Sequence, residues 1–113
     1  MAAVRMSSQM GAQWTQTGGV RFGRNRWLAI NISWPFATIE CCREVIVVSY
    51  FGTTKQLSRT EIVHIEPING MFSKGVRFVH RSEKLPRWIC FWSRDRTALV
   101  KELKEQGYLV AEA

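Results

Sequence analysis

The fold of this chain is decided by residues 87–107, which read RWICFWSRDRTALVKELKEQG. Every position from Trp88 to Trp92 is apolar, so an extended segment here carries no charge on either of its two faces. Successive side chains of a strand point to opposite faces, and a strand that is apolar on both faces is typical of a covered position. We therefore expect Arg87–Trp92 to be a central strand that is buried on both sides.

A helix is predicted directly after this strand, because the apolar period changes from 2 to 3.6. Ser93 is the expected N-cap, and Asp95 in the first turn complements the helix dipole. Gly107 suits the left-handed position after the last turn, where Tyr108 is expected to pack back on Leu103 in a Schellman motif. The predicted apolar stripe consists of Leu99, Val100 and Leu103.

Upstream of residue 87 the sequence predicts further short strands separated by turns. Pro35 has no N–H donor, so it is expected at a strand start or a sheet edge. Asn69 and Gly70 tolerate the positive φ of a tight turn. The predicted strands are Trp27–Ile32, Phe36–Cys41, Val45–Phe51, Lys55–Ser58, Ile62–Pro67, Val76–Arg81 and Arg87–Trp92.

About seven strands in series and then one helix predict a mainly-β fold, an antiparallel barrel or sandwich in which the helix plugs an open end. The chain has 113 residues, the common size of one domain. We assign that domain to residues 20–113. Residues 1–19 are rich in Ser, Gln, Thr and Gly without a sustained period, and predict a flexible arm whose one anchor is Trp14.

Positive charge is abundant and segregated along the chain. Sixteen Lys and Arg stand against nine Asp and Glu, a net charge of +7. Residues 1–26 contain no acid, and the basic stretch Lys74–Arg96 is the second concentration of charge. Such segregation favours an anionic partner, namely nucleic acid, phospholipid or an acidic protein surface, and a surface that only keeps the chain soluble is the alternative. The candidate anion-binding residues are Arg77, Arg81, Lys84 and Arg87.

Several classes of site are not expected. The three cysteines include the neighbours Cys41 and Cys42, which argues against a disulfide framework and favours a reducing, cytoplasmic location. No signal peptide or transmembrane segment is predicted. His64 and His80 each lack metal-ligand spacing to another donor, and no nucleophile elbow or phosphate-binding glycine loop is present. We expect no metal, no cofactor and no catalytic residue.

Four short segments, in their order and spacing, resemble a bacterial pleckstrin-homology-like domain over roughly residues 26–108. This resemblance implies a partly open barrel of two roughly orthogonal antiparallel sheets capped by the terminal helix. It also implies lipid, peptide or protein binding, and ring-forming oligomers in some members. Such relatives bind phosphoinositides through a basic cluster between their first two strands. The candidate loops 33–35 and 42–44 lack that cluster, so specific phosphoinositide binding is not expected. The segments that carry the resemblance are Trp34–Ala37, Leu57–Ile62, Gly75–His80 and Phe91–Trp92.

Two functions from different classes remain open, with a small-molecule enzyme the least supported third. The first is a non-enzymatic binding or assembly module that acts through protein contacts and self-association, because an aromatic-rich chain can leave an exposed apolar patch. The alternative is a basic nucleic-acid-binding β-barrel that uses Lys74–Arg96. There the interleaved aromatics Phe78, Trp88 and Trp92 would stack on bases, unless these side chains belong to the core.

Overall fold

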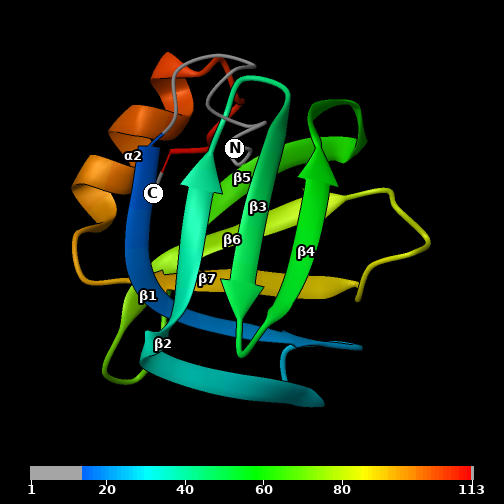
Figure 1. The fold of residues 1–113 in the computed structure, drawn as a ribbon, viewed down its shortest axis with the longest axis vertical. Coiled ribbons are helices and arrows are strands. Elements are labelled where there is room, and N and C mark those ends of the chain that lie inside the picture. The colour runs from blue at the N-terminus through cyan, green and yellow to red at the C-terminus, as the bar shows by residue number, and fades with distance from the viewer. Residues whose placement is uncertain (1–13, 113) are drawn as a thin grey trace.

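The computed structural model of the chain describes residues 14–112, in which seven strands and one α-helix follow one another (Figure 1). The strands form one antiparallel sheet in the order β4-β3-β2-β1-β7-β6-β5, which curls into a half-barrel. The mainly-β prediction with a closing helix is confirmed. The elements are β1 (Trp14–Gly23), β2 (Ala29–Cys41), β3 (Val45–Tyr50), β4 (Thr53–Ser58), the 3₁₀ turn η2 (Arg59–Glu61), β5 (Ile62–Asn69), β6 (Lys74–His80), β7 (Trp88–Ser93) and α2 (Arg96–Glu105).

The curl of the sheet comes from the bend of β1, which turns from the direction of β3 toward that of β7 (Figure 1). β1 pairs with β2 on one side and with β7 on the other, and the register against β2 shifts between Gly18 and Val20. A Cβ atom at Gly18 would collide with the carbonyl oxygen of Trp92 and the ring of Phe91. Glycine is therefore required where the bent strand crosses β7.

The expected boundary of the flexible arm at residue 19 is wrong within the described residues. Trp14–Gly19 form the first half of β1, whose ladder with β2 begins at the pair Trp14 and Cys41. The weak local pattern of this segment is overridden because β2 and β7 supply hydrogen-bonding partners along its two sides. Residues 1–13 of the expected arm lie outside the described residues.

The two strands predicted on either side of Pro35 are one continuous strand, β2. The ladder with β1 skips from Ile32 to Ala37, so residues 33–36 bulge away from β1. Pro35 lies in this bulge after a cis Trp34–Pro35 peptide bond, where its missing N–H costs no ladder hydrogen bond. A bulge can therefore carry a proline without ending the strand.

The core fills the concave side of the sheet and includes the helix. β7 lies between β1 and β6, and its residues Ile89, Cys90 and Phe91 are fully buried, which confirms the predicted central strand. Trp88 and Trp92 are only half-buried, so the outer face of β7 is partly open. The largest buried side chains are Phe78, Phe91, Ile39, Ile46, Leu57, Ile65, Ile89, Leu99 and Leu103.

The N-cap of the C-terminal helix is Asp95, two residues after the expected N-cap Ser93. The side chain of Asp95 accepts a hydrogen bond from the N–H of Ala98 at 3.0 Å, while Ser93 Oγ accepts from the N–H of Asp95. The Schellman motif is confirmed: Gly107 has φ 95°, and the N–H of Tyr108 donates to Leu103 O at 3.0 Å.

One end of the half-barrel, here called the closed end, is formed by the turn 42–44, Arg59 and residues 106–108. Arg59 donates hydrogen bonds to the carbonyl oxygens of Arg43, Gln106 and Gly107 at 2.7–2.9 Å. Its guanidinium lies 5.0 Å from the ring centre of Tyr108, whose hydroxyl donates to Cys42 O at 2.7 Å. Carbonyls that the helix end leaves free are thus satisfied by one arginine.

Candidate functional site

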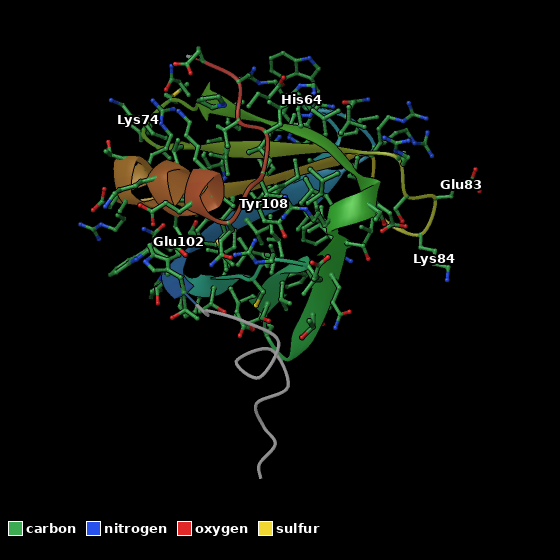
Figure 2. The ribbon with its side chains drawn as sticks, turned by 90° about the horizontal axis from the view of Figure 1, so that it is seen from above. His64, Lys74, Glu83, Lys84, Glu102 and Tyr108 are labelled. Carbon is green, nitrogen blue, oxygen red and sulfur yellow. The ribbon has the colours of Figure 1, made fainter. Side chains whose placement is uncertain are left out.

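The basic stretch predicted as one surface is divided between two sides of the molecule. Figure 2 shows Lys74 on the side of the helix and Lys84 at the tip of the β6–β7 loop, on the opposite side. Lys74 opens β6, and the strand carries the chain across the sheet before this loop begins. Among the predicted candidates, Arg81, Lys84 and Arg87 therefore belong to the loop, whereas Arg77 lies within β6.

Arg77 is engaged by its neighbours on the outer face of the sheet. Its Nη1 lies 3.3 Å from a carboxylate oxygen of Glu66 on β5, and its guanidinium lies 4.2 Å from the ring centre of Trp88 on β7. The other oxygen of Glu66 lies 3.2 Å from His64 Nε2. The predicted stacking surface is reduced accordingly, because Trp88 has an arginine on its face and Phe78 is fully buried in the core.

The β6–β7 loop forms a shallow hollow of about 440 Å³ that includes Arg81 and Arg87. His80 Nε2 lies 2.8 Å from Pro86 O and fixes one wall of the hollow. Glu83 lines the same hollow, so its charge is mixed rather than purely positive. The fourth predicted residue, Lys84, is exposed at the loop tip (Figure 2).

A larger hollow, here called the basic cleft, lies on the outer face of the sheet, at the ends of β6 and β7 that are away from the β6–β7 loop, and has a volume of about 950 Å³. Three segments form its walls: residues 31–34 of β2, the β5–β6 turn at 70–74, and the β7–α2 connection at 93–97. Arg21 of β1 and Trp92 of β7 line it from the sheet. The indole N–H of Trp92 donates to Asn31 Oδ1 at 2.8 Å, which ties β7 to the wall at β2.

Four cationic side chains from three separate segments line the basic cleft. Arg21 donates to Arg26 O at 2.7 Å, and Arg96 donates to Ile68 O at 2.9 Å. Each guanidinium is thus anchored by a carbonyl that carries no full charge, and so keeps its positive charge unpaired with an anion. The four cations are Arg21, Lys74, Arg94 and Arg96.

Aromatic rings stand beside these cations. The guanidinium of Arg94 lies 4.4 Å from the ring centre of Trp34, and 48% of Trp34 remains exposed. Phe72, at the tip of the β5–β6 turn, is 93% exposed, and its neighbour Met71 is similarly open. The ring of Phe72 is therefore almost fully open in the cleft, whereas one face of Trp34 is occupied by Arg94 and the rest of that ring is partly exposed.

Negative charge is scarce in the basic cleft. Asp95 is the one acid that lines it, and its carboxylate already caps the helix. The ion pairs found within residues 14–112 use Glu66, Glu105 and Glu112, and none includes a residue that lines the cleft. The charges of the described residues therefore give the cleft a positive potential, which attracts anions.

Sequence reasoning missed most of the basic cleft. Arg21 and Arg94 are far apart in sequence, and no local pattern brings them together. One signal was present in the exposed pair Met71-Phe72, which follows the predicted Asn69-Gly70 turn and so places two apolar side chains at a turn tip.

A second exposed surface, here called the apolar edge, follows the first part of β2 and extends to the β3–β4 turn. β3 pairs only with Ala37–Cys41, so the described structure leaves the preceding residues of β2 paired on the β1 side alone. Residues 27–39 contain no charged side chain. Phe51, in the β3–β4 turn, lies close to Phe36 of β2, and the centres of the two rings are 5.6 Å apart. The exposed side chains of the apolar edge are Trp27, Leu28, Ile30, Trp34, Phe36 and Phe51.

The loop between the first two strands differs from both loops considered in the sequence. It spans residues 24–28 and contains Arg24 and Arg26, because β1 begins before the predicted first strand. The guanidinium of Arg26 donates to Asn69 O at 3.2 Å, so this loop reaches the end of β5. The expectation that the chain does not bind phosphoinositides specifically relied on a first loop without a basic cluster. That reasoning does not apply to this loop, because it contains two arginines.

The buried thiols are poorly suited to act as nucleophiles. Burial raises the pKa of Cys41 to about 12 and that of Cys90 to about 11, and it also raises the pKa of Cys42. A thiol with so high a pKa is almost entirely protonated at neutral pH, and the thiolate is the reactive form. The three cysteines are free and buried.

Within residues 14–112, no group of three or more His, Cys, Asp or Glu side chains is arranged to hold a metal ion. No helix in this range is long and apolar enough to cross a membrane. Comparison of the chain with models of known families and with curated proteins finds no match in either.

Proposed function

We propose that this chain is a non-enzymatic assembly module of the pleckstrin-homology-like type, which self-associates through the apolar edge. The order of its elements, seven antiparallel strands and then one helix, supports this architecture of two roughly orthogonal sheets. The observation that carries the function is an open strand edge with exposed apolar side chains on residues 27–36.

An open strand edge offers unpaired backbone groups to another strand, and most proteins protect such edges with charges or covering segments. The β5 edge is covered here, because the N–H of Ile65 donates to Leu109 O and Ile65 O accepts from the N–H of Ala111, both at 2.8 Å. The β4 edge is polar, with exposed Thr53, Thr54, Gln56 and Ser58. Within residues 14–112, the apolar edge on β2 has neither kind of protection.

A second copy of the chain suits this edge because of charge. Residues 27–39 are uncharged in a chain of net charge +7, so antiparallel pairing of two copies places no like charges opposite each other. The remaining repulsion between two positive molecules acts at longer range and is screened by salt. Association is therefore expected to strengthen, not weaken, as the salt concentration rises from low to moderate values.

The test compares the mass in solution of the native chain with that of two variants, by light scattering at several protein concentrations. We expect the native chain to form a dimer or a larger assembly, and Ile30→Lys to be monomeric because it places a charge on the open edge. Ile30 is 62% exposed, so this change should leave the fold intact. Leu109→Lys is the matched control, because Leu109 is 70% exposed but lies beside β5.

Two results contradict the proposal. The first is a native chain that stays monomeric at high protein concentration and moderate salt. The second is an assembly that Leu109→Lys dissociates and Ile30→Lys does not, because the contact would then lie at the β5 side of the molecule.

A further inference from the structure

The basic cleft shares Trp34 with the apolar edge, but its cations and the ring of Phe72 are not used by self-association through β2. Arg21, Arg94 and Arg96 are held in place by carbonyl oxygens or by a stacked ring, and no carboxylate within the described residues pairs with them. Trp34 and Phe72 present exposed rings next to these cations. A ligand that satisfies both must be anionic and must carry flat, apolar surfaces.

We propose that the basic cleft binds a short segment of single-stranded nucleic acid. Its phosphates would contact Arg94, Arg96 and Lys74, and a base would stack on Phe72 or on the exposed part of Trp34. Single-strand binding sites in general join a positive groove to aromatic rings that tolerate any base. A volume of about 950 Å³ is large enough for nucleotide-sized groups.

The shape of the site favours a nucleic-acid strand over a membrane surface. Arg21 and Trp92 line the cleft from the sheet, between walls formed by β2 and by the β5–β6 turn, so a flat bilayer would meet the walls first. A flexible phosphodiester chain can enter between them. An acidic peptide would satisfy the arginines but would leave the exposed ring of Phe72 without a planar partner.

This site differs from a groove along Lys74–Arg96. Trp88 is covered by Arg77 and Phe78 is in the core, so neither ring is free to stack on a base. The cleft uses only the two ends of that stretch and adds Arg21 and Trp34, which lie elsewhere in the sequence. Phe72→Ala, and not Trp88→Ala, is therefore the informative aromatic substitution.

The experiment measures the fluorescence anisotropy of a labelled short oligothymidylate titrated with the native chain or a variant at physiological salt. We expect Phe72→Ala to weaken binding about fivefold or more, the value of one base stack. Arg94→Ala should weaken binding to a similar degree and reduce the slope of log affinity against log salt by about 0.7, one phosphate on a single strand. Both side chains are exposed, so neither change threatens the core.

Arg81→Ala is the matched control, because it removes an exposed arginine of the β6–β7 loop without touching the cleft. We expect it to change the affinity by less than about twofold, since it removes only long-range attraction. Equal losses for Arg81→Ala and Arg94→Ala would show a general attraction of polyanions to a positive chain and would overturn the proposal.

Two further ligands separate phosphate binding from base stacking. Polyphosphate carries the charge without bases, so its affinity should be lowered by Arg94→Ala and left unchanged by Phe72→Ala. Vesicles that contain phosphatidylserine test the membrane alternative. If they bind with a dependence on Phe72 while the oligothymidylate does not, the site is for a lipid surface and the proposal fails. Repeating the titration with Ile30→Lys keeps the result independent of self-association.

Discussion

The two ends of strand β3 lie in different surroundings. At the closed end, Arg59 and Tyr108 satisfy carbonyl oxygens of the turn and of the helix terminus. At the other end, the β3–β4 turn lies toward the same end of the molecule as the β1–β2 and β5–β6 loops (Figure 1). Phe51 of this turn lies beside Phe36, and the two loops expose further apolar side chains. Residues 45–60, which span both ends, contain no acid.

This contrast separates what stabilises the fold from what is available for binding. The closed end uses its polar groups internally, so changes there should lower stability and leave surfaces unaffected. The other end leaves apolar rings exposed and, within the described residues, has arginines with no carboxylate partner, which adds little to stability and suits an interface. Of the ten large exposed apolar side chains among the described residues, eight lie there: Trp27, Leu28, Ile30, Trp34, Phe36, Phe51, Met71 and Phe72.

The largest expected difference is between two phenylalanines. Phe91 is fully buried in β7, whereas Phe36 is 56% exposed. Phe91→Ala should lower the free energy of unfolding by about 3–5 kcal/mol because it opens a cavity, and Phe36→Ala by less than about 1 kcal/mol. Urea unfolding followed by tryptophan fluorescence measures both. Similar losses for the two variants would mean that the exposed end contributes to the core.

Alkaline pH should destabilise the protein through its buried thiols. The unfolded thiols ionise near pH 9, while in the folded protein the pKa of Cys90 is about 11 and that of Cys41 about 12. Their stabilising contribution is complete below pH 9 and is lost as the pH rises toward 11–12, at roughly 1 kcal/mol per pH unit for each thiol. Urea unfolding of Cys90→Ala between pH 8 and about pH 10 should show a shallower decline than the native chain; an equally steep decline would exclude a contribution from Cys90.

Arg59→Ala tests the closed end directly. The change removes three hydrogen bonds to carbonyl oxygens and the contact with Tyr108, so we expect a loss of about 1–3 kcal/mol in the free energy of unfolding. Arg43→Ala is the control, because only the backbone carbonyl of Arg43 takes part in this cluster. The mass in solution should stay that of the native chain. A changed assembly in Arg59→Ala would break the separation between stability and binding.

Phe51→Asn should have the smallest effect on stability and the opposite sign. Phe51 and Gly52 form the two-residue β3–β4 turn with φ of 46° and 78°, a conformation that asparagine adopts far more readily than phenylalanine. We expect a gain of about 1 kcal/mol in the free energy of unfolding, because the left-handed conformation costs that much for a bulky residue. Self-association should weaken at the same time, since the ring leaves the apolar edge. A loss of stability would show that the contact with Phe36 outweighs the backbone strain.

Periodicity predicted the elements in which local pattern and burial agree. Ile89, Cys90 and Phe91 in the middle of β7 and the stripe of Leu99 and Leu103 are buried as expected, because a strand or helix that is this apolar must be covered. β1 was missed because Thr15, Gln16 and Gly18 give no apolar alternation. It becomes a strand only because two other strands flank it.

The candidate sites were predicted less well, and for a different reason. Sequence reasoning grouped Arg77, Arg81, Lys84 and Arg87 because they are near one another along the chain. The structure pairs Arg77 with Glu66 and places the other three on the β6–β7 loop. A strand is an extended segment, so charges at its two ends lie far apart in space although only a few residues separate them in the sequence. They can therefore lie at opposite sides of the molecule.

The sequence by itself determined most of the extended and helical segments, where charge is concentrated, and that residues 27–39 carry none. Only the tertiary structure decided which of these segments meet. The bend of β1 at Gly18 curls the sheet, and the curl brings Arg21, Trp34, Lys74 and Arg94 around one cleft while leaving the first part of β2 without a second neighbour. A period of two fixes the face of a strand on which a side chain lies, but the neighbours of that face depend on how the whole sheet curves.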